Sequence, residues 1–300
     1  MNLDFAIGEI EVTENIFYFT KRTLERIIEH FEINPRQINV IVAGSDSMLS
    51  AVKKIDPCAE LTNNKEAMAV GKTISKINNK KIEHNIVLNF GIVCHAINFF
   101  ERQNAKTSLD DENCVYCIAH EFGHCVDNQK RNIFDEKLVL DTSLFSLNYI
   151  CEYFSRILLS EFFACYHSSF CVSNRIFYYQ NNKSNKMCRK AIEKLQEAND
   201  NQSQSRKHYF DFAQLSVQTP WFILIRYSDL IAMTIGNKNL NKPIIAWDRL
   251  DMRINEVLGR LKIVCLLLEN SYPLIPQSFS VLLKDLWNEM AKVVGYEFVE

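Results

Sequence analysis

The sequence lacks several features that mark large classes of proteins. Its 300 residues include 34 basic and 36 acidic ones, and the formal net charge of −2 gives no excess of one sign that would favour a nucleic acid as partner. Its longest apolar runs, such as residues 263–268, are far too short to cross a bilayer, so we expect no membrane partner. It contains no internal repeat and no low-complexity tract. These absences favour a globular protein.

We expect neither a disulfide framework nor a signal peptide. Ten cysteines are scattered along the chain, and only Cys114 and Cys117 form a C-x-x-C pair, with no second such pair to complete a four-cysteine metal site. Residues 1–14 are acidic, unlike the basic start of a secretory signal. We therefore expect reduced thiols and a cytoplasmic protein, with export by a non-classical route as the alternative.

One short motif carries recognisable chemistry: residues 120–124 read H-E-F-G-H, a match to the pattern H-E-x-x-H. Each residue of an α-helix advances about 100°, so His120 and His124 lie one turn apart on the same face. Two neutral imidazoles at this separation can bind one zinc ion, and Glu121 beside them can activate a zinc-bound water. The acidic residues 110–112 fit the start of such a helix, where negative charge is favourable. The sequence therefore predicts a zinc site on this helix.

The region before the motif predicts strands mixed with helices. Residues 38–42, 67–74 and 85–93 predict strands, and residues 20–31 predict a helix with one apolar face. We expect a small mixed sheet with helices over residues 1–105, leading directly into the helix of the motif.

The region after the motif predicts helices almost throughout, so the fold class is α+β. We expect metal-binding helices at about residues 110–175, which complete a domain of residues 1–180, and a helical C-terminal region at residues 181–300 that packs on this domain. Residues 201–205, rich in Gln and Ser, are the best candidate for a subdomain boundary. Residues 250–268 place their apolar side chains on one helical stripe, which is typical of a core-facing helix.

A catalytic zinc normally has three protein ligands and leaves a fourth position for water. The pattern H-E-x-x-H-x-x-G-x-x-H would supply a third histidine, but its Gly and His positions hold Asp127 and Lys130, which excludes it. The candidates that remain are downstream acidic residues: Asp127, Asp135, Glu136, Asp141, Glu152 and Glu161.

Two of these candidates, Glu152 and Glu161, lie in the same predicted helix. They are nine residues apart, about 900° of rotation, so only one of them can face the metal. Small residues such as Ala164 and Ser168 follow Glu161 and allow a second helix to approach closely. Glu152 has Arg156 one turn further on, and a solvated ion pair explains it more simply. We therefore favour Glu161 as the third ligand.

We assign Asp127 and three further histidines roles other than binding the metal. Asp127 lies one turn beyond His124, and we interpret it as an acceptor for the second ring N–H of an imidazole ligand or as a structural contact. The histidines His84, His95 and His167 are packing or surface residues in this interpretation, not ligands.

Two segments together resemble a known family. Residues 120–127, H-E-F-G-H-C-V-D, followed by residues 161–164, E-F-F-A, closely resemble the zinc-protease domain of anthrax lethal factor and its relatives. These are gluzincins, in which the Glu of the second segment is the third zinc ligand. Cytoplasmic metallopeptidases of the ImmA/IrrE type share this pattern of H-E-x-x-H and a later Glu in a helix. The resemblance covers roughly residues 85–175 and is specific for the zinc site.

The resemblance implies a zincin-like catalytic domain with defined roles for four residues. His120, His124 and Glu161 are then the zinc ligands, and Glu121 is the general base. The zinc lowers the pKa of its water and polarises the scissile carbonyl. Glu121 takes the proton of that water and passes it to the leaving amine.

Two further features follow from the resemblance. The lethal-factor group has a tyrosine seven residues before its ligand Glu, where this chain has Phe154. The residue that stabilises the transition state is therefore open among Tyr149, Tyr153, His208, Tyr209 and Tyr227. Tyr153 is our choice, with an ordinary core aromatic as the alternative reading of it. By the same analogy, the strand of residues 85–93, with Asn89 and Gly91, is the edge along which an extended substrate lies, because glycine allows a close backbone approach.

The sequence thus predicts a zinc-dependent endopeptidase with a protein or peptide substrate. The competing function is a zincin-like scaffold that binds a protein without cleaving it, although the intact Glu121 argues against this, because a structural zinc site needs no general base. Within the enzyme class, the substrate is either a regulatory protein of the same bacterial cytoplasm or a host protein attacked by a toxin.

Overall fold

The structure, a computed structural model, describes residues 1–8, 11–59, 63–64, 67–68, 71–78, 81–102, 107–133, 146–240 and 252–295. Over these residues the architecture is α+β, as the sequence predicts. The chain divides into two compact units, Met1–Lys137 with His167–Val172 and Leu138–Tyr166 with Ser173–Glu300. The first unit therefore ends well before residue 180, the expected domain border, and takes in one later segment.

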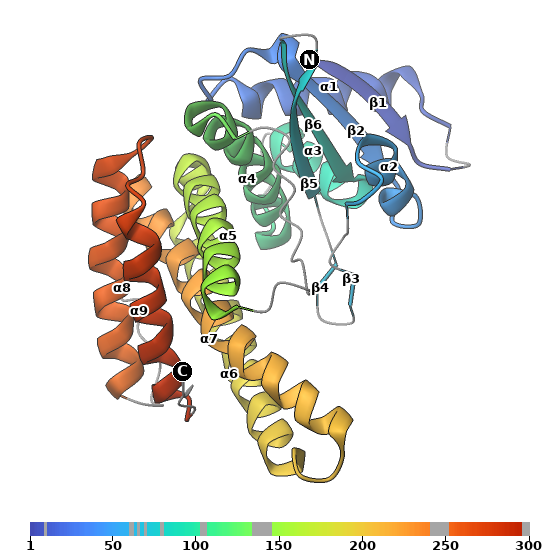
Figure 1. Cartoon of the computed structure of the whole chain (residues 1–300). Helices are drawn as coiled ribbons and strands as arrows, with labels where there is room; N and C mark the ends of the chain where they lie inside the picture. Colours follow the sequence, from blue (N-terminus) through green and yellow to red (C-terminus); the bar gives the residue numbers. More distant parts are fainter. Residues whose placement is uncertain are drawn as a thin grey trace. The chain divides into compact units, whose positions relative to one another are not determined.

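The first unit is built on a four-stranded sheet in the order β1–β2–β6–β5, which Figure 1 shows in blue and teal. β1 (Asn2–Ala6), β2 (Ile38–Ala43) and β6 (Lys81–Asn89) run parallel, whereas β5 (Gly71–Asn78) is antiparallel to β6. β2 confirms the strand predicted at residues 38–42. Among the described strands, β1 and β5 form the two edges of this sheet.

Two other predicted strands differ from the observed ones. The prediction at residues 67–74 covers the start of β5 and the strand β4 (Ala67–Met68), which pairs with β3 (Asn63–Asn64) in a separate small sheet. The strand predicted at residues 85–93 ends at Asn89. The Asn89 side chain accepts a hydrogen bond from the Gly91 amide at 2.8 Å and caps the following helix. The apolar run therefore continues as a helix instead of a strand.

Helices cover both faces of the sheet. On one face, α1 (Glu14–Ile28), α3 (Phe90–Glu101) and α4 (Leu109–Arg131) share a core with Ile86 and Leu88. On the other face, α2 (Met48–Ile55) packs on a smaller core that includes Val87. Successive side chains of a strand point to opposite faces, which explains this division of β6.

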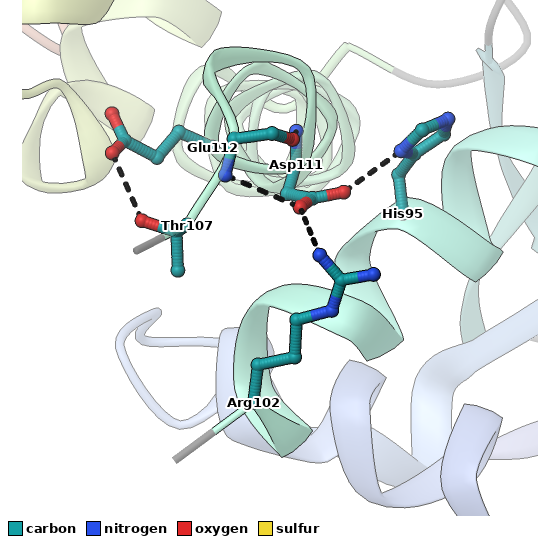
Figure 2. A network of polar contacts seen from close by, with 6 residues as sticks. His95, Arg102, Thr107, Asp111 and Glu112 are labelled. Carbon is teal, nitrogen blue, oxygen red and sulfur yellow. Dashed lines mark hydrogen bonds and ion pairs between the residues drawn. The ribbon is translucent and has the colours of Figure 1, made fainter. Parts of the chain in front are cut away.

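A polar network fixes the start of α4 beside α3, as Figure 2 shows. Ser108 and Asp111 form a capping box, in which the Asp111 amide donates to Ser108 Oγ at 3.0 Å and the Ser108 amide donates to Asp111 Oδ2 at 3.3 Å. From α3, His95 Nδ1 lies 2.8 Å from Asp111 Oδ1, and Arg102 lies 4.0 Å from Oδ2. Burial alone would raise the pKa of Asp111, but the contacts with Ser108 and His95 hold it below its usual value. The helix of the motif is therefore anchored at its first turn.

The second unit is made of helices: most of α5 (Leu147–Ser168), then α6 (Asn174–Asn201), α7 (Arg206–Gly236), α8 (Met252–Ser271) and α9 (Ser278–Val293). α6 and α7 form a long hairpin (Figure 1), so the segment at residues 201–205 turns the chain within a unit and is no boundary between units. Stacked rings of Trp221 and Trp287, with centroids 6.3 Å apart, join α7 to α9. No described helix is long and apolar enough to span a bilayer.

One sequence prediction about side chains is confirmed. The predicted stripe on α8 is buried from Ile254 to Leu268, while its first member, Leu250, lies outside the described residues. All ten cysteines fall within the described ranges, and none forms a disulfide.

Candidate metal centre

The H-E-x-x-H motif lies in the middle of α4. The helix begins at the capping box and ends at Asn132, whose φ of 58° is left-handed and stops the helix. The rings of His120 and His124 are partly exposed, one turn apart, with centroids 4.7 Å from each other. Between them, Phe122 and Gly123 are buried, so the helix turns its apolar face to the core and its two imidazoles away from it.

Glu161 is carried by α5, the end of which belongs to the first unit. The last turn of α5, with His167, continues into the short 3-10 helix η2 (Ser169–Cys171). The Phe170 ring of η2 packs against His30, at 4.6 Å between centroids, and against Phe31, at 5.2 Å. Glu161 belongs to the second unit and lies six residues before His167, at which the first unit resumes.

His120, His124 and Glu161 form a group that could hold a metal ion. Each offers one ligand atom, and these atoms all lie within 4.8 Å of one another, which makes this the only such group among the described residues. Two imidazole nitrogens and one carboxylate are the donors of many catalytic zinc sites, which keep a fourth position for water. The donor set fits zinc better than magnesium or calcium, which prefer oxygen ligands.

The other candidates for the third ligand lie elsewhere. Glu152 is exposed and accepts a hydrogen bond from Arg156 at 2.7 Å, the i,i+4 pair that the sequence predicts. Asp127 is fully buried and accepts a hydrogen bond from Arg131 Nε at 2.7 Å, with a second contact to the same guanidinium. This pair gives Asp127 a structural contact, while its action on an imidazole ligand stays a prediction. Asp135, Glu136 and Asp141 lie outside the described residues.

Glu121 is buried, and its carboxylate points at β5. Thr73 Oγ1 donates to Glu121 Oε2 at 2.7 Å and lies 3.0 Å from the Glu121 carbonyl oxygen. A Cβ atom built on Gly71 would lie 2.6 Å from Glu121 Cγ and 2.8 Å from Oε1. The side chain proposed as base therefore occupies space that only a glycine leaves open. Sequence reasoning missed both β5 residues, because no motif marks them.

The structure corrects the expected substrate edge. Asn89 and Gly91 do not lie on an edge strand, because β6 pairs with β2 on one side and with β5 on the other. The main-chain groups of β6 are therefore used within the sheet. Asn89 caps α3, and Gly91 lies in the first turn of that helix. The edge beside the motif is β5.

Tyr153 lies on α5 and is partly buried, with its ring 5.3 Å from that of Phe154. The ring of Phe154 in turn stacks on that of Trp221, with centroids 5.8 Å apart, so Phe154 is a packing residue. Eight residues separate Tyr153 from Glu161, about 12 Å along a helix. The part of Tyr153 in a reaction stays a prediction.

None of the three histidines expected to be packing or surface residues belongs to the group of His120, His124 and Glu161. His84 is fully buried with Nδ1 2.8 Å from Ser75 Oγ, and burial lowers its pKa to about 4. His95 pairs with Asp111. Burial also lowers the pKa of His167 to about 4, helped by Lys130 and Arg131.

A comparison of the chain with protein-family profiles, curated proteins and solved structures finds no match.

Proposed function

We propose that the chain is a zinc-dependent endopeptidase of the gluzincin type. The observation that carries the proposal is the convergence of three ligand atoms of His120, His124 and Glu161 within 4.8 Å, beside a buried glutamate. His120 and His124 come from one helix and Glu161 from another, far along the chain, so the group is not a by-product of helical spacing. The motif alone would bring together only the two histidines.

The zinc, when bound, would supply a Lewis acid that polarises the scissile carbonyl and acidifies a water molecule. Glu121 follows His120 directly in the sequence and is not one of the three candidate ligands. Its carboxylate is therefore our candidate for proton transfer. It accepts a proton from the attacking water and delivers it to the leaving amine. Burial of Glu121 beside β5 limits the competing water around the carboxylate.

The edge strand β5 supports an extended peptide as substrate. Among the described strands, β5 forms an edge of the sheet and pairs with β6, and an edge strand is a place at which a further strand can add. A peptide that adds to this edge gains affinity from main-chain hydrogen bonds, whatever its sequence. Thr73 of β5 touches Glu121, so such a peptide would run past the base.

The decisive variant is Glu121→Gln, because Gln keeps the size of the side chain and an acceptor oxygen for Thr73 but cannot take the proton. We expect the zinc content to stay at the wild-type level while peptide hydrolysis falls by about 10²–10⁴-fold, the usual contribution of a general base. A peptide library supplies the substrate. Glu152→Gln is the matched control, since Glu152 forms an exposed pair with Arg156, and it should hydrolyse like the wild type.

Full hydrolytic activity in Glu121→Gln would contradict the mechanism. If neither the wild type nor the variant cleaved any peptide, yet both captured the same protein partner, the chain would be a binding scaffold and not an enzyme.

A further inference from the structure

We infer that Gly71 and Thr73 of β5 position the carboxylate of Glu121, so that this strand sets the geometry of the proposed base. The inference rests on the proposed function for the role of Glu121. The placement of the carboxylate itself rests only on contacts between α4 and β5, which both belong to the first unit.

Every second residue of β5 faces α4. Gly71 and Thr73 lie against Glu121, and Ser75 Oγ accepts a hydrogen bond from Asn128 at 3.0 Å. Glu121 and Asn128 are seven residues apart, about two helical turns or 10 Å, and residues 71–75 of an extended strand span about 13 Å. The strand therefore runs along the helix, and both of its polar contacts with α4 come from the same face.

A buried contact with His84 fixes the register of β5 relative to α4. Ser75 Oγ lies 2.8 Å from His84 Nδ1, and His84 of β6 is fully buried. Asn128 of α4 donates to the same Ser75 oxygen, so one hydroxyl joins β5 to both β6 and α4. A slip of β5 by one residue would break both contacts and turn Thr73 away from α4. Thr73 is thus held opposite Glu121 by groups two residues further along the strand.

Thr73 and Gly71 act on different parts of the Glu121 side chain. The Thr73 hydroxyl has one proton, and the contact of 2.7 Å with Oε2 is a charge-assisted hydrogen bond that fixes this oxygen. Gly71 lies beside Oε1, Cδ and Cγ, and it leaves room for them only because it has no Cβ. Thr73 thus binds one carboxylate oxygen, and Gly71 leaves the space that the rest of the side chain fills.

The hydroxyl of Thr73 is tested by two substitutions in the zinc-loaded full chain. Thr73→Val keeps the shape and removes the donor, so we expect kcat to fall about ten- to a hundredfold, the scale of a misplaced catalytic group, with KM and zinc content close to wild type. Thr73→Ser restores the donor and should recover most of kcat. Thr234→Val is the matched control, because the Thr234 hydroxyl bonds only within its own helix, to the Ile231 carbonyl oxygen at 2.8 Å.

The space at Gly71 is tested by Gly71→Ala. The new Cβ must displace the Glu121 side chain, so kcat should fall at least as far as in Thr73→Val. Gly259→Ala is the matched control, since a Cβ there meets nothing within 4 Å, and it should keep wild-type kcat.

Crystal structures of metal-free Thr73→Val and Gly71→Ala give a readout that needs no activity. We expect the Glu121 carboxylate to leave its wild-type position in both while the strands and α4 stay in place. An unmoved carboxylate, a wild-type kcat in Thr73→Val, or a Thr73→Ser variant as slow as Thr73→Val would overturn the inference. If the wild type cleaves no peptide, the proposed function fails, and the two crystal structures still decide whether these residues position Glu121.

Discussion

At the scale of single residues, the centre depends on which side of a helix a carboxylate faces. Glu152 and Glu161 are nine residues apart on α5; Glu152 pairs with Arg156, whereas Glu161 belongs to the group with the two histidines of the motif. This division follows from helical geometry and was predictable from the sequence. Glu121 differs, because its surroundings come from a strand nearly 50 residues earlier in the chain.

The division between Glu152 and Glu161 makes a prediction about zinc affinity. Glu161→Ala removes one of three ligands, so we expect the affinity for zinc to fall by well over about tenfold, more than the loss of a residue that only supports a ligand. Glu152→Ala removes an exposed ion pair and should leave the affinity nearly unchanged. Competition with a chromogenic chelator measures both. A larger loss of zinc affinity in Glu152→Ala than in Glu161→Ala would show that Glu152 is the third ligand.

The buried His84 makes a prediction about pH. Its pKa is about 4 in the folded chain and near 6.5 when unfolded, so between these values the unfolded chain binds more protons. Above pH 6.5, His84 should therefore not change the free energy of unfolding. Its contribution should lower this free energy as the pH drops from 6.5 toward 4 and should become constant below pH 4. The loss amounts to on the order of 3 kcal/mol. His167 acts in the same direction.

Urea unfolding between pH 7 and pH 4 measures this effect. His84→Gln has no titrating group and should show a flatter decline, whereas His208→Gln, in the partly exposed first turn of α7, should decline like the wild type. Equal slopes in His84→Gln and the wild type would mean that His84 is not buried in its neutral form.

At the scale of helices and strands, the sequence predicts where a helix or strand lies in the chain better than it predicts which strands pair with each other. The motif helix, β2 and the α8 stripe follow from periodicity and from end signals. The edge strand was misassigned, although the composition holds a clue. Three consecutive apolar residues, Ile86 to Leu88, are typical of a strand buried on both faces, and such strands lie inside a sheet. β5, which carries Lys72 and Lys76, has the composition of an edge. Strand order itself depends on pairing between distant segments, which local patterns do not encode.

The proposed pairing of a peptide with β5 makes a prediction about substrates. A peptide paired with this edge donates and accepts main-chain hydrogen bonds at every second residue. Methylation of the backbone nitrogen at those positions should raise KM, while methylation at the intervening positions should leave it close to the unmodified value. A series of peptides methylated one residue at a time, derived from any cleaved sequence, gives the pattern. A KM that responds equally at all positions would argue against pairing with a strand.

At the scale of the whole molecule, most of the chain contributes no residue to the candidate metal centre. The candidate ligands, the base and its positioning residues lie between residues 71 and 161, and α6 to α9 contribute none of them. The apolar stripes of these helices predict their burial but carry no chemistry from which a role could be read. The sequence thus predicts the centre far better than the function of the second unit.

The most direct test of the central claim is the metal content of the full-length chain, purified without added metal. Two histidines and a glutamate that converge on one point should retain about one zinc ion per chain, and His120→Ala should lose it. After stripping with a chelator, the wild type should take up zinc again in the same ratio and should not take up magnesium. A wild-type protein that contains no zinc and, once stripped, binds none would contradict the account.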